Sequence, residues 1–201
     1  MEIVAIKSKA YKGILDQKTY ILSQGDEVVI IDAGVDIEDV REVVQNKKVL
    51  AVLLTHLHFD HIYEIEGYLK EWNMPVYIAP NAEDKFGDFM KNCSYIFRTE
   101  LVFNVPQKNI KYYAEKLKIG SFEIDVFFTP GHSQDSVCLL INKNLFCGDL
   151  VLGGTIGRTD LYDSSFIQMK SSLEKLEYID FEMAYPGHYE AMTKQEVLNC
   201  F

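Results

Sequence analysis

The residues best suited to chemistry in this chain are its histidines, three of which fall within residues 55–61 (T-H-L-H-F-D-H). Alternate residues of an extended backbone point to the same side, so His56, His58 and Asp60 can converge on one position. The chain is predicted to turn into a helix after His61, which redirects this imidazole toward a second position beside the first. The stretch therefore predicts a cluster of metal ligands.

The remaining candidate ligands each follow a glycine at the end of an apolar run. They are His132 in Pro130-Gly131-His132, Asp149 in Cys147-Gly148-Asp149, and His188 in Pro186-Gly187-His188. A glycine directly before a ligand permits a tight backbone turn at a strand end. Imidazole and carboxylate ligands suit zinc, iron or manganese. A carboxylate such as that of Asp149 has two oxygens and can bridge two ions, and two divalent cations close together explain why so many ligands are present.

Two non-catalytic explanations of these residues are disfavoured. A single histidine, such as His188 alone, is more often structural than a ligand, but packing has no use for three adjacent imidazoles. A closed structural zinc site is usually four-coordinate and rich in cysteine, whereas the four cysteines here are scattered without C-x-x-C spacing. The pattern is therefore typical of an enzyme's metal site.

The elements that must position these residues are predicted from hydrophobic periodicity. Strands are predicted at residues 19–23, 27–31, 49–54, 76–79, 122–128, 136–141, 145–147 and 183–185. Helices are predicted after an N-cap at Asp36, from Ile62 to Trp72, in a mixed region from 82 to 98, after Ser164 or Ser165, and at the C-terminus. Strands leading into helices indicate α/β, and hairpins at both ends indicate antiparallel pairing as well. A layered αββα sandwich, in one domain spanning residues 1–201, fits this mixture.

The bulk properties exclude several partners. The formal net charge is −10 and no Lys/Arg cluster is present, so nucleic acid is not an expected partner. No apolar run approaches the roughly 20 residues that cross a bilayer, and the first residues lack the apolar core of a signal peptide. We expect a cytoplasmic protein that acts on a small molecule and has no membrane partner. Whether it forms a homodimer is left open.

The motifs at 55–61, 130–132, 148–149 and 186–188 resemble those of the metallo-β-lactamase-fold hydrolases. The resemblance runs from Asp32-Ala33-Gly34 to His188, and it implies that fold. It implies that His56, His58 and His132 hold one ion, that Asp60, His61 and His188 hold the other, and that Asp149 bridges them. In this family a hydroxide between two metal ions, zinc being expected first, attacks a carbonyl. Asp60 is the implied catalytic residue, which orients the hydroxide and passes a proton to the leaving group.

Within that family, residues 153–160 (G-G-T-I-G-R-T-D) are similar to a segment of glyoxalase II-like (hydroxyacylglutathione hydrolase-like) thioester hydrolases. Arg158 and Asp160 are expected either to support the loop after Asp149 through a charge-assisted pair or to touch substrate. Asp32 resembles a group that supports the metal loop from outside the ligand set, with solvent exposure at a turn as the alternative.

The chain departs from the family's pattern at several positions. It has Ile62-Tyr63, Asp135 and Tyr189 where the family often has glycine. These bulkier groups are expected to narrow or reshape the mouth, with Tyr63 and Tyr189 either at the substrate rim or packed there structurally. The sequence stops at Phe201, without the C-terminal helical domain that binds glutathione in full-length glyoxalase II enzymes, which weighs against glutathione as part of the substrate.

The leading hypothesis is hydrolysis of a thioester or related acyl substrate by a two-metal centre. A persulfide dioxygenase, which shares the G-R-T-D segment and holds one iron through residues matching His56, His132 and Asp149, is the first alternative. A lactonase with the same ligand set is the second. The flavodiiron class is disfavoured because it carries Glu at the position of His58 and needs a flavodoxin domain. An exported antibiotic lactamase commonly has Cys at the position of Asp149, and a protein without activity is disfavoured by the complete ligand set.

Overall fold

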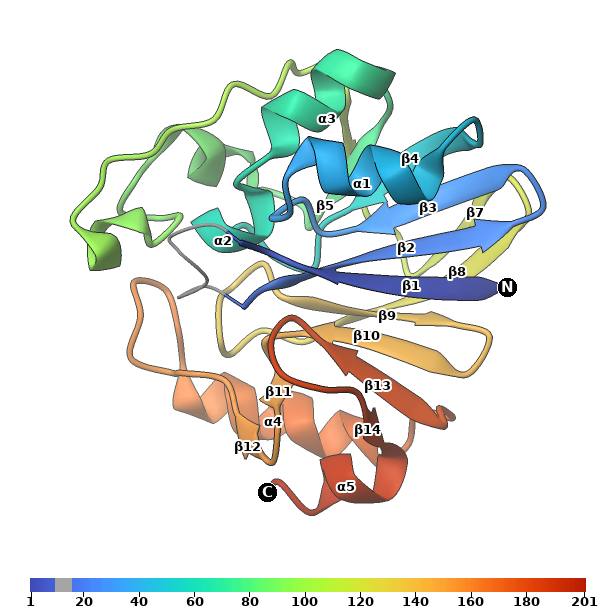
Figure 1. Cartoon of the computed structure of the whole chain (residues 1–201). Coiled ribbons are helices and arrows are strands. Elements are labelled where there is room, and N and C mark those ends of the chain that lie inside the picture. The colour runs from blue at the N-terminus through green and yellow to red at the C-terminus, as the bar shows by residue number, and fades with distance from the viewer. Residues whose placement is uncertain (10–15) are drawn as a thin grey trace.

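Two six-stranded β-sheets stack face to face in the computed structural model, which describes residues 1–9 and 16–201 (Figure 1). The first sheet has the order β1-β2-β3-β4-β5-β6, with β1 (Glu2–Lys7), β2 (Lys18–Gln24), β3 (Glu27–Ile31), β4 (Lys48–Leu53), β5 (Val76–Ile78) and β6 (Ile110–Tyr112). The second has the order β14-β13-β10-β9-β8-β7, with β7 (Lys116–Ile119), β8 (Phe122–Phe128), β9 (Val137–Ile141), β10 (Asn144–Gly148), β13 (Met183–Pro186) and β14 (Met192–Thr193). Strands β11 (Val151–Leu152) and β12 (Thr155–Ile156) form a separate hairpin.

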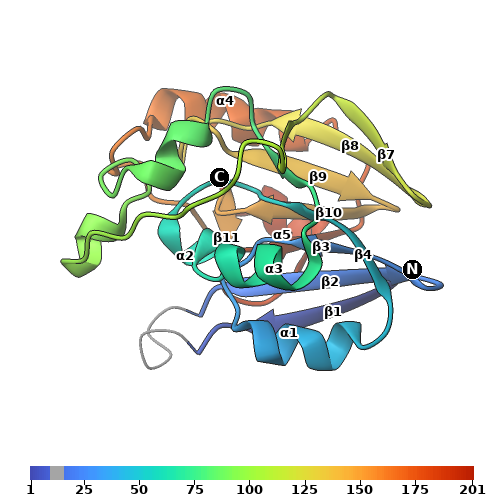
Figure 2. The ribbon, with the colours of Figure 1, turned by 90° about the horizontal axis from the view of Figure 1, so that it is seen from above.

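Helices cover the outer face of each sheet (Figures 1 and 2). Helices α1 (Ile37–Val44) and α3 (Ile65–Trp72) lie on the first sheet, and α4 (Phe166–Leu176) and α5 (Lys194–Leu198) on the second. The short helix α2 (Phe59–Ile62) lies at the edge where the sheets meet. The predicted αββα sandwich of mixed α/β class is therefore confirmed.

The predicted apolar runs form the core. Ile30 in β3 and Leu53 in β4 are fully buried in one large cluster that fills the space between the sheets and beneath α1 and α3. A second cluster, including Met169 and Leu173, lies between the second sheet and its helices. The side chain of Asp36 accepts a hydrogen bond from the Glu38 amide at 2.9 Å, which confirms the predicted N-cap of α1.

Strand direction brings the site loops to one edge of the sandwich. Strand β8 runs antiparallel to β9, β9 antiparallel to β10, and β10 parallel to β13, so β8, β10 and β13 end at the same edge. Two backbone hydrogen bonds join the loops there, from Val137 N to Thr55 O at 2.9 Å and from Gly187 N to Gly148 O at 2.8 Å. The first of these connects the two sheets directly beside the histidine loop.

The predicted helix from Ile62 to Trp72 is wrong as a single element, because α2 ends at Ile62 and α3 begins at Ile65. Backbone groups at this break bind Ala33 instead of continuing the helix: Ala33 N donates to His61 O at 2.7 Å and Glu64 N donates to Ala33 O at 2.8 Å. A partner distant in the chain therefore sets the position of His61, which periodicity does not detect.

Other local elements also differ from the predictions. The mixed helical region is two short 3-10 helices, η2 (Glu83–Gly87) and η3 (Ser94–Phe97), joined by turns. Strand β1 and the short strands β6, β7, β11, β12 and β14 are not among the predicted strands. All of these except β1 are runs of two to four residues, which carry too little pattern to be found. No helix among the described residues is long and apolar enough to cross a membrane.

We predict that Leu53→Ala lowers the free energy of unfolding by about 2–5 kcal/mol, because it opens a cavity in a packed core just before the histidine loop. Ile167→Ala is the matched control, since the Ile167 side chain is 81% exposed and its loss is expected to change stability by no more than about 0.5 kcal/mol. Equilibrium urea unfolding measures both; equal stabilities for the two variants would contradict this placement of the core.

Candidate metal centre

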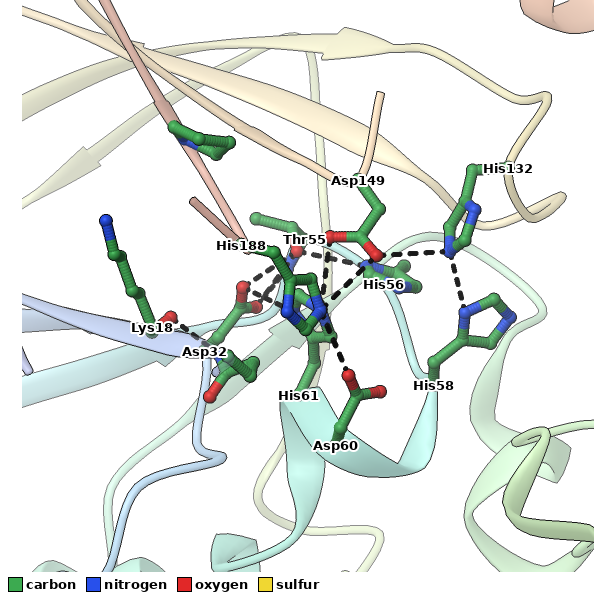
Figure 3. Close-up of polar contacts among 12 residues, drawn as sticks. Lys18, Asp32, Thr55, His56, His58, Asp60, His61, His132, Asp149 and His188 are labelled. Atoms are coloured by element: carbon green, nitrogen blue, oxygen red, sulfur yellow. Dashed lines mark hydrogen bonds and ion pairs between the residues drawn. The ribbon is translucent and has the colours of Figure 1, made fainter. Parts of the chain in front are cut away.

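All seven predicted ligands gather where the two sheets meet (Figure 3). His56 and His58 lie in the loop after β4, Asp60 and His61 in α2, His132 after β8, Asp149 after β10 and His188 after β13. They form three groups whose ligand atoms lie within 4.8 Å of one another: His56-His58-His132, Asp60-His61-His188, and His56-His61-Asp149. The first two groups contain the same residues as the two ligand sets that the resemblance implies, and the third joins them.

The carboxylate of Asp149 lies between the two sets. Its Oδ1 is 3.3 Å from Nε2 of His61, while its Oδ2 is 3.5 Å from Nε2 of His132 and 3.6 Å from Nε2 of His188. One side chain therefore faces imidazoles of both groups, which is the geometry that a bridging ligand needs.

Asp60 occupies the opposite side of the second group. Its Oδ2 lies 3.1 Å from His188 Nε2 and 3.9 Å from His61 Nε2. Burial by itself raises the pKa of Asp60, but the imidazoles of His61 and His188 outweigh it and hold the pKa below its usual range. Asp60 is therefore a carboxylate at neutral pH.

Two imidazoles of the first group, those of His56 and His58, differ in charge from the two of the second group. Burial, together with the neighbouring imidazoles, lowers the pKa of His56 and of His58 well below the usual value, so both are neutral and able to ligate. Burial also lowers the pKa of His61 and His188, but nearby carboxylates outweigh it, those of Asp32 and Asp149 at His61 and that of Asp149 at His188. The pKa of His61 is raised well above its usual value and that of His188 to about 9. The second group thus attracts positive charge strongly.

Buried polar atoms that make no hydrogen bond show that these residues fit cations. Among the described residues, Nε2 of His56, His58 and His61 and Oδ1 of Asp149 are buried and make no hydrogen bond. An unsatisfied buried polar atom is costly, and four in one cluster point to a bound group. The donors are imidazole nitrogens and carboxylate oxygens, which suit zinc, iron and manganese. The candidate site therefore fits divalent metal.

Asp32 is buried behind the ligand set, so the alternative of an exposed turn is wrong. Its carboxylate accepts hydrogen bonds from the Thr55 amide at 2.8 Å and the Thr55 hydroxyl at 2.9 Å, and it lies 2.8 Å from Nδ1 of His61. It is held in the left-handed region, at φ 61°, that Asp tolerates better than most residues. These contacts fix both the start of the histidine loop and the ring of His61.

Asp16, just before β2, and Lys18, its first residue, support the His188 loop and were not predicted from the sequence. Oδ1 of Asp16 lies 3.0 Å from Nδ1 of His188. The Lys18 amide donates to the carbonyl of Gly187 at 2.7 Å, and its ammonium group donates to the carbonyl of Tyr189. Together they hold both the ring of His188 and the main chain on either side of it in sequence. Asp16 and Lys18 lie about 170 positions from His188, and no local pattern marks them.

The Arg158 side chain pairs with Asp160, which agrees with the expectation of a charge-assisted pair. The two interactions are 2.9 and 3.0 Å long and both side chains are mostly exposed. The backbone of Arg158 has a closer relation to the ligands, because its carbonyl oxygen lies 3.0 Å from Nδ1 of His132. The segment therefore supports His132 through its main chain.

The glycines before the ligands serve two different purposes. Gly148 has φ 49°, and a Cβ there would lie 2.7 Å from the Thr55 hydroxyl, so this position needs glycine for its turn and its close packing. Gly187 has no positive φ, although the chain bends at this residue, so the bend does not depend on glycine's conformational freedom. Its reason is space: a Cβ on Gly187 would overlap Oδ1 of Asp149 and the ring of His61.

The departures from the family's pattern do not all lie at the mouth. Ile62 is fully buried in the core, and Asp135 is 5% exposed with its Oδ2 accepting the Leu57 amide at 2.8 Å. The expectation that these two narrow the mouth is wrong, because both point into the protein. Tyr189 is 54% exposed and Tyr63 is half-buried at the end of α2, and their place at a substrate rim stays a prediction.

The chain belongs to the metallo-beta-lactamase superfamily, whose family model matches residues 13–188. The probable metallo-hydrolase YqgX of Bacillus subtilis (strain 168) is 32% identical over 193 residues, covering 92% of each chain. The hydroxyacylglutathione hydrolase of Buchnera aphidicola subsp. Schizaphis graminum (strain Sg) is 29% identical over 147 residues, which cover 72% of this chain and 50% of that protein.

Solved structures of the superfamily share the fold over nearly the whole chain. BLEG-1 B3 metallo-beta-lactamase is 29% identical, with a TM-score of 0.88 over 97% of this chain and 95% of that one. TTHA1623, crystallised in a di-iron-bound form, is 25% identical, with a TM-score of 0.80 over 98% and 96%. Membership of this superfamily, together with the histidine cluster, supports a metal-dependent hydrolase.

We predict that Gly187→Ala lowers zinc affinity by about 10–100-fold, because the added methyl group displaces Asp149 and His61. Gly87→Ala is the matched control, since a Cβ at Gly87 meets no atom within 4 Å and its backbone needs no positive φ. Competition with a chromogenic zinc chelator measures both affinities, and circular dichroism checks the fold. A folded Gly187→Ala protein that binds zinc as tightly as the wild type would contradict the close packing of Gly187 against Asp149 and His61.

Proposed function

We propose that this protein is a two-metal hydrolase of a thioester or related acyl substrate. The observation that carries the proposal is the position of Asp149, whose two oxygens face imidazoles of both ligand groups. A single ion would leave one of these groups without its cation. Two ions use every ligand and also account for the buried atoms that make no hydrogen bond.

The ligands divide as the geometry groups them. His56, His58 and His132 would hold the first ion and Asp60, His61 and His188 the second, and Asp149, which lies between the two groups, would be available to both. The ligand types favour zinc, with iron or manganese as alternatives. Bound divalent cations polarise an acyl carbonyl and lower the pKa of water, which supplies a nucleophile at neutral pH.

Asp60 supplies the proton transfers in this proposal. It is ionised, because the neighbouring imidazoles lower its pKa, and it can accept a hydrogen bond from the attacking water and orient it. Its carboxylate takes the proton that the water gives up as it attacks the carbonyl carbon, and passes that proton to the sulfur as the carbon–sulfur bond breaks. A thiol has a pKa near 8.5, so a thioester needs less help from a general acid than an amide does.

Support for a thioester comes from the relative named as a hydroxyacylglutathione hydrolase and from residues 153–160. In the structure this segment packs against the ligands: Gly157 N donates to Leu150 O at 3.2 Å, and a Cβ on Gly157 would overlap the Asp149 carbonyl. The segment's clearest role is to hold Asp149 and His132, so the substrate class rests chiefly on the relative.

A persulfide dioxygenase with one iron is the second candidate. His132 Nε2 lies 3.5 Å from Asp149 Oδ2 and the His56 and His132 ring centroids are 5.0 Å apart, so these three residues can present two imidazoles and a carboxylate to one ion. This candidate leaves His61 and His188 without a role, although both lie against Asp149. The two-metal hydrolase is therefore preferred.

The test is thioester hydrolysis by protein loaded with zinc. The reaction is measured by the free thiol that it releases. The panel contains lactoylglutathione, acyl thioesters without glutathione, a lactone and a β-lactam. We predict hydrolysis of at least one thioester, loss of the activity on chelation, and a loss of more than about 100-fold in Asp149→Ala. Asp180→Ala is the control, because Asp180 pairs with Lys143 at the surface.

Two results would contradict this function. Asp149→Ala protein that is folded and fully active would refute the mechanism. Oxygen uptake on a persulfide by protein holding one iron per chain, without thioester hydrolysis, would establish the second candidate instead. Cleavage of only the lactone or only the β-lactam would keep the metal site and reject the thioester.

A further inference from the structure

A buried lysine lies close behind the first ligand group. Lys85 is in η2, its side chain is 6% exposed, and its Nζ lies 2.6 Å from Oδ1 of Asp135 and 2.6 Å from Oδ2 of Asp163. The side chains of Asp135 and Asp163 are 4% and 16% exposed. Burying three charged groups carries a large desolvation cost, so such a cluster is weak evidence for stability alone. Its placement indicates a different role.

Asp135, the first partner of Lys85, also contacts the histidine loop. Asp135 uses its other oxygen, Oδ2, to accept the Leu57 amide at 2.8 Å, and Leu57 stands between His56 and His58. Asp135 also follows His132 by three residues, in the loop between β8 and β9. One carboxylate, itself fixed by Lys85, therefore sets the distance between the loops that carry all three imidazoles of the first group.

The second partner leads to the support of His132. Asp163 ends the segment that begins at Arg158, whose carbonyl oxygen lies 3.0 Å from Nδ1 of His132. The side chain of Gln134 donates to the Asp163 carbonyl at 3.2 Å, which ties this segment to the His132 loop a second time. Lys85 thus joins the loop after β4, the loop after β8 and the segment before α4.

The second ligand group is held by other residues. Asp32 contacts Nδ1 of His61 and Asp16 contacts Nδ1 of His188, at 2.8 and 3.0 Å. Both supporting residues come from the N-terminal part of the chain, well before η2 in the sequence. The Lys85 cluster is therefore directed at one group of ligands rather than at the site as a whole.

We propose that Lys85 is a positioning residue for the first metal ion, which acts by holding Asp135 and Asp163 so that His56, His58 and His132 keep the spacing of a three-imidazole site. This inference rests on the metal site and not on the thioester activity. Lys85→Met keeps much of the side-chain volume but leaves two buried carboxylates that repel each other. The Leu57 amide then loses its fixed acceptor, and the two loops separate.

The test is a titration of metal-free protein with Co²⁺, followed by visible absorption, which reports the ligands around each bound ion. His132→Ala identifies which binding step belongs to the first group. We expect Lys85→Met to weaken that same step by about 10–100-fold and to alter its spectrum. Lys91→Met is the matched control. Lys85 and Lys91 both line a cavity of about 300 Å³, but Lys91 pairs with Asp84 near the surface, and its loss is expected to change neither affinity nor spectrum.

A rescue separates positioning from general destabilisation. In Lys85→Met/Asp163→Asn the repulsion between the two carboxylates is removed, and the affinity of the first step is expected to recover in part, by about threefold or more relative to Lys85→Met. Folded Lys85→Met protein that binds Co²⁺ with the wild-type affinity and spectrum would overturn the proposal.

If Lys85→Met does not fold, Asp135→Asn carries the same test with a smaller change. The amide keeps the shape but cannot serve both Lys85 and Leu57 as strongly, so the first step is expected to weaken about tenfold. An unchanged first step in folded Asp135→Asn would overturn the proposal. Because every readout is metal binding, these outcomes are independent of whether the enzyme hydrolyses thioesters.

Discussion

The contact between Asp149 and the imidazole of His61, which comes from the opposite sheet, is the interaction on which this structure depends. Asp149 follows β10 in the second sheet, whereas His61, whose Nε2 lies 3.3 Å from Oδ1 of Asp149, follows β4 in the first. Both side chains are buried, and a buried carboxylate needs positive charge close by. Protons on His61 and His188 provide it without metal, and divalent cations bound as proposed would provide it more completely, because they would also face the nitrogens that make no hydrogen bond.

The rest of the site keeps those imidazoles in place from behind. Four rings have their outward nitrogen Nδ1 held: His56 by the Thr55 hydroxyl, His61 by Asp32, His132 by the Arg158 carbonyl and His188 by Asp16. Such contacts select the tautomer and orientation in which a ring can ligate. They come from segments far apart in the chain, and the sandwich is what brings them together. The strands end at one edge of the sandwich, and backbone hydrogen bonds between their loops hold the supporting groups together there.

The sequence predicted the sandwich and the convergence of the seven ligands, because both leave strong local patterns. Continuous apolar runs such as that ending at Leu53 identify buried strands, and three histidines within seven residues have few other uses. It did not predict Asp16 or Lys85, because a residue that contacts the site through the tertiary fold carries no local signal. It also misplaced Ile62 and Asp135 at the mouth, since a family comparison tells which residue differs but not which way its side chain points.

The central claim, that one site holds two ions shared by Asp149, is tested most directly by crystallography of zinc-loaded protein with data collected at the zinc absorption edge. We expect two anomalous peaks, one against His56, His58 and His132 and the other against Asp60, His61 and His188, with Asp149 next to both. A single peak at full zinc saturation, with His61 and His188 bound only to carboxylates, would contradict it.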